Sequence, residues 1–476
     1  MEATEPRRRL HSSSNRPSAL DSPAVDVTST ASLKSHIMPA EDATMSKPMA
    51  PLSVLPLSTV VRTLATTTIS SSRILLPPSL VAMNVLAHTR NPILNPDKNP
   101  ILGWLLKKTF YAQFCAGEHG AEVRKTVSGL RQIGFTGVIL GYAREIVLSE
   151  SQTKNLTACD VGPEKDECVR SEIGPWAAGT METVRLAEPG DFVALKFTGA
   201  GRQALYALKN RLAPPKELRA AIDDICNLAR ERNVPLLFDA EQTALQAGID
   251  DWTLEYQRKF NTDPGHAIIY GTYQAYLKAC PAVLASHLSA AAKDGFTLGV
   301  KLVRGAYLGA DPRHIIHDTK EDTDRYYDAI SESLIRREWN DILKQDVEYP
   351  LVSVLLGSHN LQSVRHARAV RDSITITPPK TYPAQGPVSE LAIAQLQGMA
   401  DDVSCELVCM KKADKSGSGE STRAYKYIVW GTTGECMKYL LRRAHENRDA
   451  VQRTRSGRDA MWGEIKRRFW SSLGRA

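Results

Sequence analysis

The chain has 476 residues, of which 42% are hydrophobic and 24% charged, so it can form a large core and is not disordered throughout. Its 60 Lys and Arg against 53 Asp and Glu give a mild, dispersed charge of +7, which argues against a nucleic-acid-binding protein. Eight cysteines without a CxxC pair exclude a disulfide-rich secreted domain and argue against zinc.

Residues 1–50 are rich in Ser, Thr, Ala and Pro and carry three consecutive arginines at 7–9, which predicts a disordered tail. A mitochondrial targeting segment is the alternative, since Arg and Ser suit one but acidic residues such as Glu2, Glu5, Asp21 and Asp26 do not. Residues 51–106 are predicted to form a helical arm and linker, with helices broken at Pro77-Pro78 and turns over 91–100. No segment reaches the length of a membrane span, and surface attachment stays open.

From residue 107 to 470 the pattern changes to short apolar runs that alternate with helical periodicity. Helices are expected over 217–233, 272–293 and 323–345. Continuous apolar runs are typical of parallel strands buried on both faces. The eight runs are 137–141, 192–196, 234–239, 267–270, 298–303, 351–356, 391–396 and 427–430. Their strict alternation with helices predicts an α/β fold of the (β/α)8 TIM-like barrel type. A doubly wound sheet is the alternative, but no Gly-rich fingerprint follows the first strand.

Polar side chains stand at most of the predicted strand ends, where barrel proteins carry their active sites. Each has an ordinary explanation as well: Asp239 could cap a helix, His359 could belong to a turn, and Lys196 could be solvated. A metal site is not favoured, because one His and one Asp are too few ligands. This predicted ring consists of Lys196, Asp239, Thr272, Gln274, Lys301, Arg304, Ser358, His359, Asn360, Gln395 and Tyr427.

A last helix is predicted over 434–451, directly after the final strand. Tyr439, Arg442, Arg443 and Glu446 recur at helical spacing and share one face of it. This pattern fits either a solvated, salt-bridged stripe or a clamp in which two guanidinium groups bind a carboxylate over the barrel mouth.

Several segments together resemble the proline dehydrogenase family, most closely its fungal mitochondrial members. The most specific are KLVRGAY at 301–307 and YLLRRAHEN at 439–447; the others are FYAQF at 110–114, FDAEQ at 238–242, AIIYGTYQ at 267–274, GSHN at 357–360 and QLQGM at 395–399. The resemblance runs from about residue 110 to 470 and implies a distorted (β/α)8 barrel that binds FAD.

The resemblance also assigns roles to individual residues. Lys301 stands where bacterial members have Arg, Ser358 where they have Thr, and Gly271 where relatives have an amide side chain, which puts one flavin contact in doubt. Substrate binding and catalysis are implied for Lys196, Asp239, Tyr427, Tyr439, Arg442, Arg443 and Glu446. FAD binding is implied for Gln274, Lys301, Val303, Gly305, Ala306, Tyr307, Ser358, His359, Asn360 and Gln395.

The implied reaction is oxidation of L-proline to Δ1-pyrroline-5-carboxylate, with hydride transfer to flavin N5 and electrons passed to a ubiquinone-type acceptor. The implied location is the matrix side of the inner mitochondrial membrane, with peripheral attachment. Two alternatives remain: a hydroxyproline dehydrogenase, and a barrel that binds ligands without catalysis. The intact set of Lys301, Asp239, Arg442, Arg443 and Glu446 argues against the second.

Overall fold

A computed structural model describes residues 50–89, 91–144, 156–159, 161–309, 311–376, 391–413, 422–449 and 451–474, without the side chains of 375–376, 413, 446–449 and 451–453. The predicted tail, except for residue 50, therefore lies outside the described residues. The sequence also predicts flexible surface insertions in the Pro-rich stretch 378–387 and in the Lys-, Ser- and Gly-rich stretch 411–423. The first stretch lies outside the described residues, as does 414–421 of the second, while a helix, Asp401–Ala413, and a strand, Arg423–Trp430, take in its two ends.

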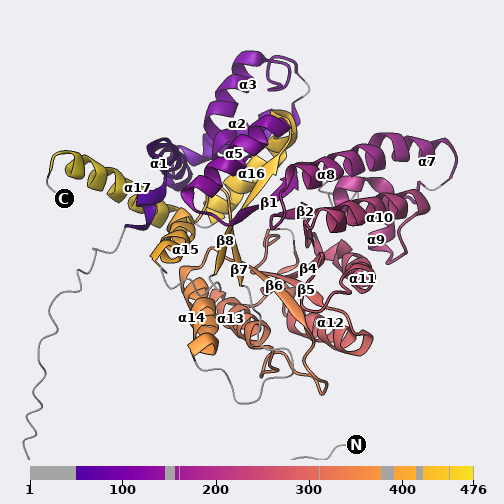
Figure 1. Ribbon diagram of the computed structural model, residues 1–476. Coiled ribbons are helices and arrows are strands. Elements are labelled where there is room, and N and C mark those ends of the chain that lie inside the picture. Colours follow the sequence, from indigo (N-terminus) through magenta and orange to yellow (C-terminus); the bar gives the residue numbers. More distant parts are fainter. Residues whose placement is uncertain are drawn as a thin grey trace, which may run out of the picture. The chain divides into compact units, whose positions relative to one another are not determined.

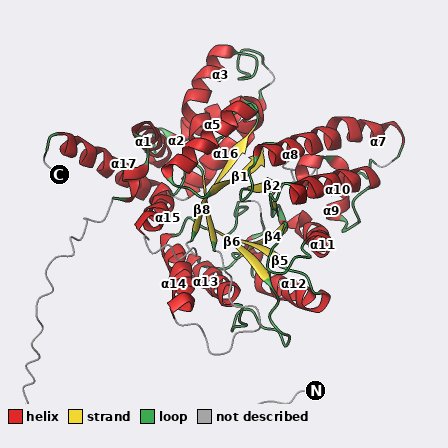
Figure 2. Ribbon diagram, in the orientation of Figure 1, coloured by secondary structure: helices red, strands yellow, loops and turns green. Residues whose placement is uncertain are grey.

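Eight parallel strands form a closed barrel at the centre, in the order in which they occur in the chain (Figures 1 and 2). All eight expected apolar runs contribute a strand, which confirms the predicted (β/α)8 fold. The barrel closes where β1 pairs with β8, from Gly137 beside Tyr425 to Tyr142 beside Trp430. The strands are β1 Gly137–Tyr142, β2 Phe192–Leu195, β3 Leu236–Phe238, β4 Ile269–Gln274, β5 Leu298–Val303, β6 Val352–Gly357, β7 Ala392–Leu396 and β8 Arg423–Trp430.

Helices surround the barrel and bury one apolar face each. In α10, for example, Leu218, Ile222, Ile225 and Ala229 are buried at helical spacing, while the charged positions between them face outward. The helices between strands are α7 Gly162–Cys168, α8 Gly174–Leu186, α9 Arg202–Lys209, α10 Lys216–Glu231, α11 Thr243–Phe260, α12 Cys280–Asp294, α13 Lys320–Arg336, α14 Leu361–Ile376 and α15 Asp401–Ala413.

The remaining helices precede the first strand or follow the last one. They are α1 Leu57–Ser71, α2 Leu76–His88, α3 Pro100–Leu106, α4 Ala112–Phe114 and α5 Gly120–Ile133, then α16 Thr433–Asp449 and α17 Val451–Ser472. Short 3-10 turns cover Pro51–Val54, Phe197–Ala200 and Arg313–Ile315, and single π-type turns cover Lys107–Tyr111 and Val169–Ile173.

Three boundaries differ from expectation. The first break lies at 72–75, and Pro77 and Pro78 sit in the first turn of α2, where a missing N–H costs nothing. The helix expected over 272–293 begins only at Cys280, because β4 continues to Gln274 through polar and aromatic residues. Helix α13 ends at Arg336, where Arg337 adopts a left-handed conformation, rather than continuing to 345.

The core has two layers, one inside the barrel and one between strands and helices. Inside, the Phe192 ring meets the rings of Tyr270 and Tyr425 edge-on, with centroids 5.6 and 5.2 Å apart. These large side chains fill the barrel, so the space available to ligands lies above them at the carboxyl ends of the strands.

Candidate active site

Asp239 is the centre of a buried polar cluster at the barrel mouth. It follows β3 directly and accepts hydrogen bonds from side chains on β5 and β8 and from the residue that follows β2. Lys301 Nζ on β5 lies 2.5 Å from Oδ1, while Lys196 Nζ and the Tyr427 hydroxyl lie 3.0 and 2.9 Å from Oδ2. Helix α11 begins at Thr243 without a side-chain cap, so the interpretation of Asp239 as a helix cap is wrong.

The charges in this cluster support one another. Burial alone raises the pKa of Asp239, but the charges and hydrogen bonds of Lys196 and Lys301 overcome this and hold it well below its usual value. Burial lowers the pKa of Lys301, and Asp239 opposes that shift. Burial and the Asp239 charge raise the pKa of Tyr427, so the hydroxyl stays protonated and donates. The mouth therefore holds two cations around one carboxylate in a water-poor environment.

Beside this cluster, the end of β4 presents polar atoms that no described residue satisfies. Gln274 Oε1 accepts the Ala306 N–H at 3.1 Å, whereas the buried Gln274 Nε2 and Thr272 Oγ1 have no hydrogen-bond partner among the described residues. Buried polar atoms of this kind normally have partners. These two groups, together with Lys301, therefore fit a ligand rich in hydrogen-bonding atoms, such as a flavin.

The loop after β5 needs glycine at one point. Gly305 has φ +149°, and a Cβ there would lie 2.4 Å from the Tyr276 ring. The Tyr276 hydroxyl in turn donates to Asp311 at 2.5 Å, which anchors the far side of this loop. Val303 is half-buried at the end of β5, Ala306 is exposed, and Tyr307 is half-buried near the loop tip.

The turn after β6 carries Ser358, His359 and Asn360, and their polar atoms serve local bonds. His359 Nε2 accepts the Leu396 N–H at 3.1 Å, which ties the turn to the end of β7. Ser358 Oγ accepts the Asn360 N–H, and Asn360 Oδ1 accepts the N–H of Gln362 at the start of α14. The buried Gln395 side chain donates to the Ser358 carbonyl and accepts from Ser404 Oγ, so it shapes this turn from beneath.

Helix α16 brings Tyr439, Arg442 and Arg443 against the ends of β7 and β8. Tyr439 is buried in one apolar cluster with Tyr427 and Leu396. The guanidinium carbons of Arg442 and Arg443 lie 6.0 and 5.0 Å from the centre of the Tyr439 ring. Arg443 is only 4% exposed, which contradicts a solvated stripe. The Glu446 side chain lies outside the described residues.

Two residues of interest point away from the mouth. Arg304 turns outward, where it donates to Ser363 Oγ, pairs with Asp324 and lies over the Tyr327 ring. Its side chain therefore contacts α13 and α14, not the Asp239 cluster. Gly271 also faces outward, since a Cβ there would meet Thr253 and Gln257 of α11. An amide side chain at this position would point to α11, so the doubt about a lost flavin contact does not apply.

Glu241 is a residue of the mouth that the sequence did not single out. It is buried and accepts hydrogen bonds from the Thr198 N–H at 3.0 Å and from the Thr198 hydroxyl. It thereby fixes the turn that follows Lys196. The only signal in the sequence was an acidic residue two positions after Asp239, which is common in surface loops.

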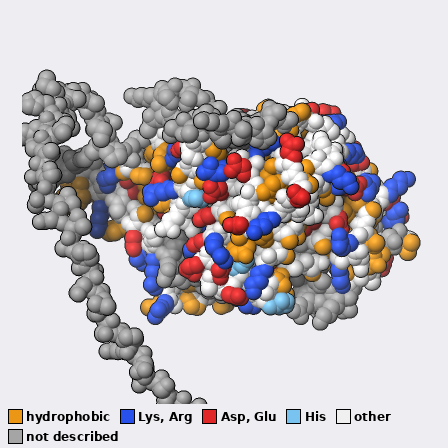
Figure 3. Space-filling view, turned by 90° about the horizontal axis from the view of Figure 1, so that it is seen from below, with side chains coloured by type: hydrophobic (Ala, Val, Ile, Leu, Met, Phe, Trp, Pro, Cys, Tyr) orange, Lys and Arg blue, Asp and Glu red, His pale blue; other side chains and the backbone are white. Residues whose placement is uncertain are grey.

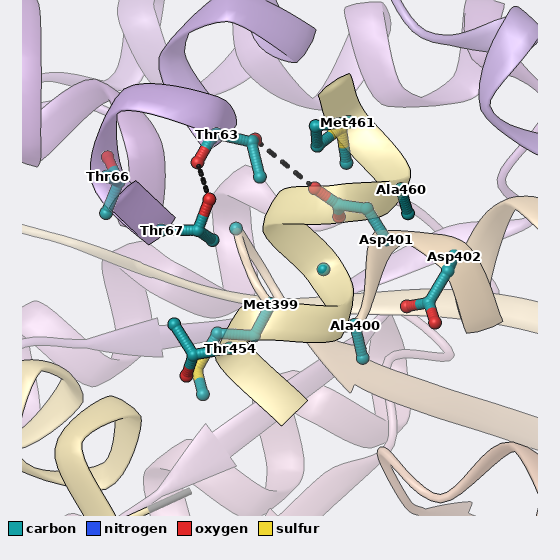
Figure 4. A pocket seen from close by; sticks show the side chains of 12 residues that line it. Thr63, Thr66, Thr67, Met399, Ala400, Asp401, Asp402, Thr454, Ala460 and Met461 are labelled. Atoms are coloured by element: carbon teal, nitrogen blue, oxygen red, sulfur yellow. Dashed lines mark hydrogen bonds between the residues drawn. The ribbon is translucent and has the colours of Figure 1, made fainter. Parts of the chain in front are cut away.

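A separate hollow lies outside the barrel, between α1, α17 and the turn before α15 (Figure 4). Thr63 of α1 points toward Asp401 across it, and its Oγ1 donates to Asp401 at 3.5 Å. None of the residues predicted to bind substrate or cofactor lines this hollow, so it is distinct from the barrel mouth.

The closed (β/α)8 barrel has buried charges at the carboxyl ends of its strands. These two features are typical of (β/α)8-barrel enzymes. The proline dehydrogenase family model matches residues 123–456. The chain therefore belongs to the proline dehydrogenase family, as the sequence resemblance predicted.

Several relatives agree with this assignment. The probable mitochondrial proline dehydrogenase of Schizosaccharomyces pombe is 28% identical over 76% of this chain and 80% of its own. Mitochondrial proline dehydrogenase 1 of Arabidopsis thaliana is 33% identical over 78% and 77% of the two chains. Hydroxyproline dehydrogenase of Bos taurus is 29% identical over 78% and 83%.

A solved structure, proline utilization A from Bdellovibrio bacteriovorus inactivated by N-propargylglycine, has a similar fold, with a TM-score of 0.56 and 18% identity. The match covers 83% of this chain but only 38% of that longer chain. At this level of identity the likeness supports the barrel fold alone.

Proposed function

We propose that this chain is an FAD-dependent enzyme that oxidises L-proline to Δ1-pyrroline-5-carboxylate and passes the electrons to a ubiquinone-type acceptor. The observation that carries the proposal is the cluster of Lys196, Lys301 and Tyr427 around Asp239, beside the helix that presents Arg442 and Arg443. Mitochondrial relatives support a mitochondrial location, and we propose the matrix side of the inner membrane.

In this proposal the two arginines of α16 bind the carboxylate of the substrate. Planar guanidinium groups match a carboxylate through parallel, charge-assisted hydrogen bonds. The buried Tyr439 ring beneath them restricts their movement, so the bound amino acid keeps one orientation. Lys196 adds positive charge on the same side of the mouth. We propose that Glu446 orients the arginines.

On the other side of the mouth, Lys301, Gln274, Val303, Gly305, Ala306 and Tyr307, with the turn 358–360 and Gln395, would hold FAD. When bound, FAD accepts the hydride that leaves the ring carbon next to the amine. The Lys301 ammonium, held in place by Asp239, stabilises negative charge next to it. The substrate amine must be neutral to release hydride, so turnover rises with pH on the acid side.

A related function deserves a direct comparison, because a hydroxyproline dehydrogenase matches the chain over a similar length. The two substrates share the carboxylate and amine and differ by one hydroxyl on the ring. Arginines that bind the carboxylate do not separate them, and selectivity therefore depends on the pocket around the ring.

The decisive experiment records the visible spectrum of the purified full chain without oxygen or quinone, before and after addition of L-proline. Flavin absorption that bleaches with L-proline and not with 4-hydroxyproline is the expected result. Bleaching by 4-hydroxyproline and not by L-proline would identify the chain as a hydroxyproline dehydrogenase. Absence of flavin absorption after FAD is supplied would overturn the proposal.

The clamp is tested by Arg443→Ala, compared with Arg455→Ala at an exposed position of α17. Loss of a charge-assisted contact costs about 1.5–3 kcal/mol, roughly 10- to 100-fold in kcat/KM for proline. The control should retain full activity. Equal turnover by both variants would mean that Arg443 does not bind the substrate.

A further inference from the structure

The largest group of exposed large apolar side chains lies in one short part of the chain. Among the described residues, nine of twenty such side chains fall within 74–105, five between 106 and 461, four within 462–473 and two in α1. Ile74, Ile101 and Trp104 are 82%, 78% and 62% exposed. We call this set the α2–α3 patch; it comprises Ile74, Leu75, Val81, Val85, Ile93, Leu94, Ile101, Trp104 and Leu105.

Helix α2 is apolar all round and contains no Asp, Glu, Lys or Arg. Such a helix is normally buried on every side. Only one face of α2 is covered, because Leu80, Met83 and Leu86 pack against α16 while Val81 and Val85 remain exposed. Leu106 at the end of α3 packs in the same cluster, so the end of α3 is anchored to the structure that α2 forms with α16, and the rest of α3 extends outward (Figure 1).

The charges around the patch are positive. The stretch 73–108 contains five Lys or Arg and one acidic residue, Asp97. One of the five, Lys107, forms ion pairs with Glu118 and Glu122 at 2.6 and 2.8 Å, so its charge is engaged within the protein. Arg73, Lys98 and Lys108 are exposed. Asp97 accepts hydrogen bonds from the Gly434 N–H and the Thr432 hydroxyl at the start of α16. Its negative charge is therefore partly compensated by these donors. By contrast, acidic and basic side chains are interspersed over the face shown in Figure 3.

We propose that the α2–α3 patch is the surface by which this protein attaches to an anionic lipid bilayer. Apolar side chains that include Trp, surrounded by cations, are typical of segments that lie in the membrane interface. A second copy of the chain fits less well, because a symmetric interface would bring the cations of both copies together. In the described residues no single helix could span a membrane; α1 and α2 pass that test only as a pair bent by 104°.

The patch lies close to the barrel mouth, so attachment there would bring the mouth to the membrane. The link between attachment and electron transfer rests on the proposed function. Helix α2 packs directly against α16, the helix that carries Tyr439, Arg442 and Arg443. A bilayer bound at the α2–α3 patch therefore lies next to the barrel mouth. An apolar quinone dissolved in that bilayer then has the shortest route to the site of oxidation.

The test is flotation of the full-length protein with vesicles of phosphatidylcholine that contain anionic cardiolipin. The variant Ile101→Glu with Trp104→Glu places two charges in the patch. The matched control, Leu212→Glu with Val347→Glu, changes two apolar side chains that are 48% and 42% exposed elsewhere on the barrel. We expect the wild type and the control to float, and the patch variant to bind at least about tenfold less.

Proline oxidation with a soluble artificial acceptor is measured in parallel and should be equal in all three proteins. Oxidation with quinone supplied in the vesicles should fall only in the patch variant. The proposal is overturned if the wild type does not float, if the patch variant floats like the wild type, or if the patch instead mediates self-association. Failure of the soluble-acceptor assay in the wild type would count against the proposed function, independently of the vesicle result.

Discussion

At the scale of single residues, the site depends on how charges are neutralised inside the barrel. Asp239 is 5% exposed, and a carboxylate so deeply buried is costly unless it is paired. Two lysines and a tyrosine hydroxyl pair with it. Because each partner lies on or directly after a different strand, the cluster both joins the strand ends and sets the charge of Lys301.

Asp239→Asn preserves shape and removes the charge. Turnover should fall by roughly 10- to 100-fold, since charge-assisted bonds to both lysines are lost. Asp239 opposes the lowering of the Lys301 pKa by burial, so its removal lowers that pKa further. Lys301 then loses its proton at lower pH, and the alkaline limb of the profile of kcat/KM against pH shifts to lower pH.

Tyr427→Phe serves as the control for this prediction, because it removes a hydrogen bond to Asp239 and leaves every charge in place. Its activity should decrease without a shift of the alkaline limb. A profile of Asp239→Asn that kept its wild-type alkaline limb would show that Asp239 does not act through the charge of Lys301.

Asp250 on α11 provides a separate test by pH. Burial raises its pKa to about 7. Because the folded state then holds a proton that the unfolded state releases, stability is greatest below the unfolded pKa of about 4 and declines as pH rises through 7. Asp250→Asn should remove this decline and keep the bond from Gln246.

At pH 8 the Asp250→Asn variant should exceed the wild type in free energy of unfolding by an amount of order 2 kcal/mol. The full rise in the Asp250 pKa would correspond to a larger free-energy difference, but the Asp250 carboxyl is partly exposed and solvent screening reduces that difference. Urea unfolding at pH 4 and pH 8 measures the difference. An equal difference at both values would exclude titration of Asp250 as the cause.

At the scale of elements, glycines decide where helices approach closely. Helix α11 crosses α9 at Gly248, where a Cβ would lie 2.3 Å from the Leu208 carbonyl oxygen. The obstacle is backbone, which cannot rotate away as a side chain can. Gly129 on α5 is the opposite case, with nothing within 4 Å of the position of its Cβ.

Gly248→Ala should therefore destabilise the protein by about 1–3 kcal/mol, the usual range for forcing an extra group into a packed contact. Gly129→Ala should stabilise it by about 0.5–1 kcal/mol through helix propensity alone. Thermal unfolding of the two variants should shift in opposite directions. Equal shifts would mean that α9 and α11 can separate at little cost.

At the scale of the whole described unit, its first α-helix and its last α-helix meet on the outside of the barrel. Helix α17 packs against α1, and Arg468 donates to the carbonyls of Leu52 and Leu55 at 3.1 and 2.8 Å. Thr63 of α1 donates to Asp401 at the start of α15, and Asp401 pairs with the buried Lys426 of β8 at 2.7 Å. One buried ion pair thus links the barrel to the N-terminal arm.

Lys426→Met should cost about 3–5 kcal/mol of unfolding free energy, because it leaves the Asp401 carboxylate buried without its cation. Adding Asp401→Asn to this variant should recover a large part of that loss, since the uncompensated charge is then absent. Denaturant unfolding of the two variants measures the coupling. A double variant no more stable than Lys426→Met would show that the pair contributes little through its charges.

The sequence alone predicted the eight strands and the proline dehydrogenase family. Each βα unit is local in the chain, and short apolar runs identify buried strands without knowledge of the rest. It also placed Asp239, Lys301 and Tyr427 at strand ends. Roles for these residues came from the family resemblance and remain predictions.

Only the tertiary structure decided which of these residues meet. Strand alternation puts Lys301, within β5, and Arg304, directly after it, on opposite sides, but only the closed barrel shows that Lys301 reaches Asp239 at the end of β3 and Arg304 reaches Asp324 of α13. Glu241 became part of the mouth through Thr198, 43 positions earlier in the chain. Likewise, the exposed face of α2 is apparent only once its other face is covered by α16. Closure of the barrel sets these contacts between distant segments, and no local pattern in the sequence encodes it.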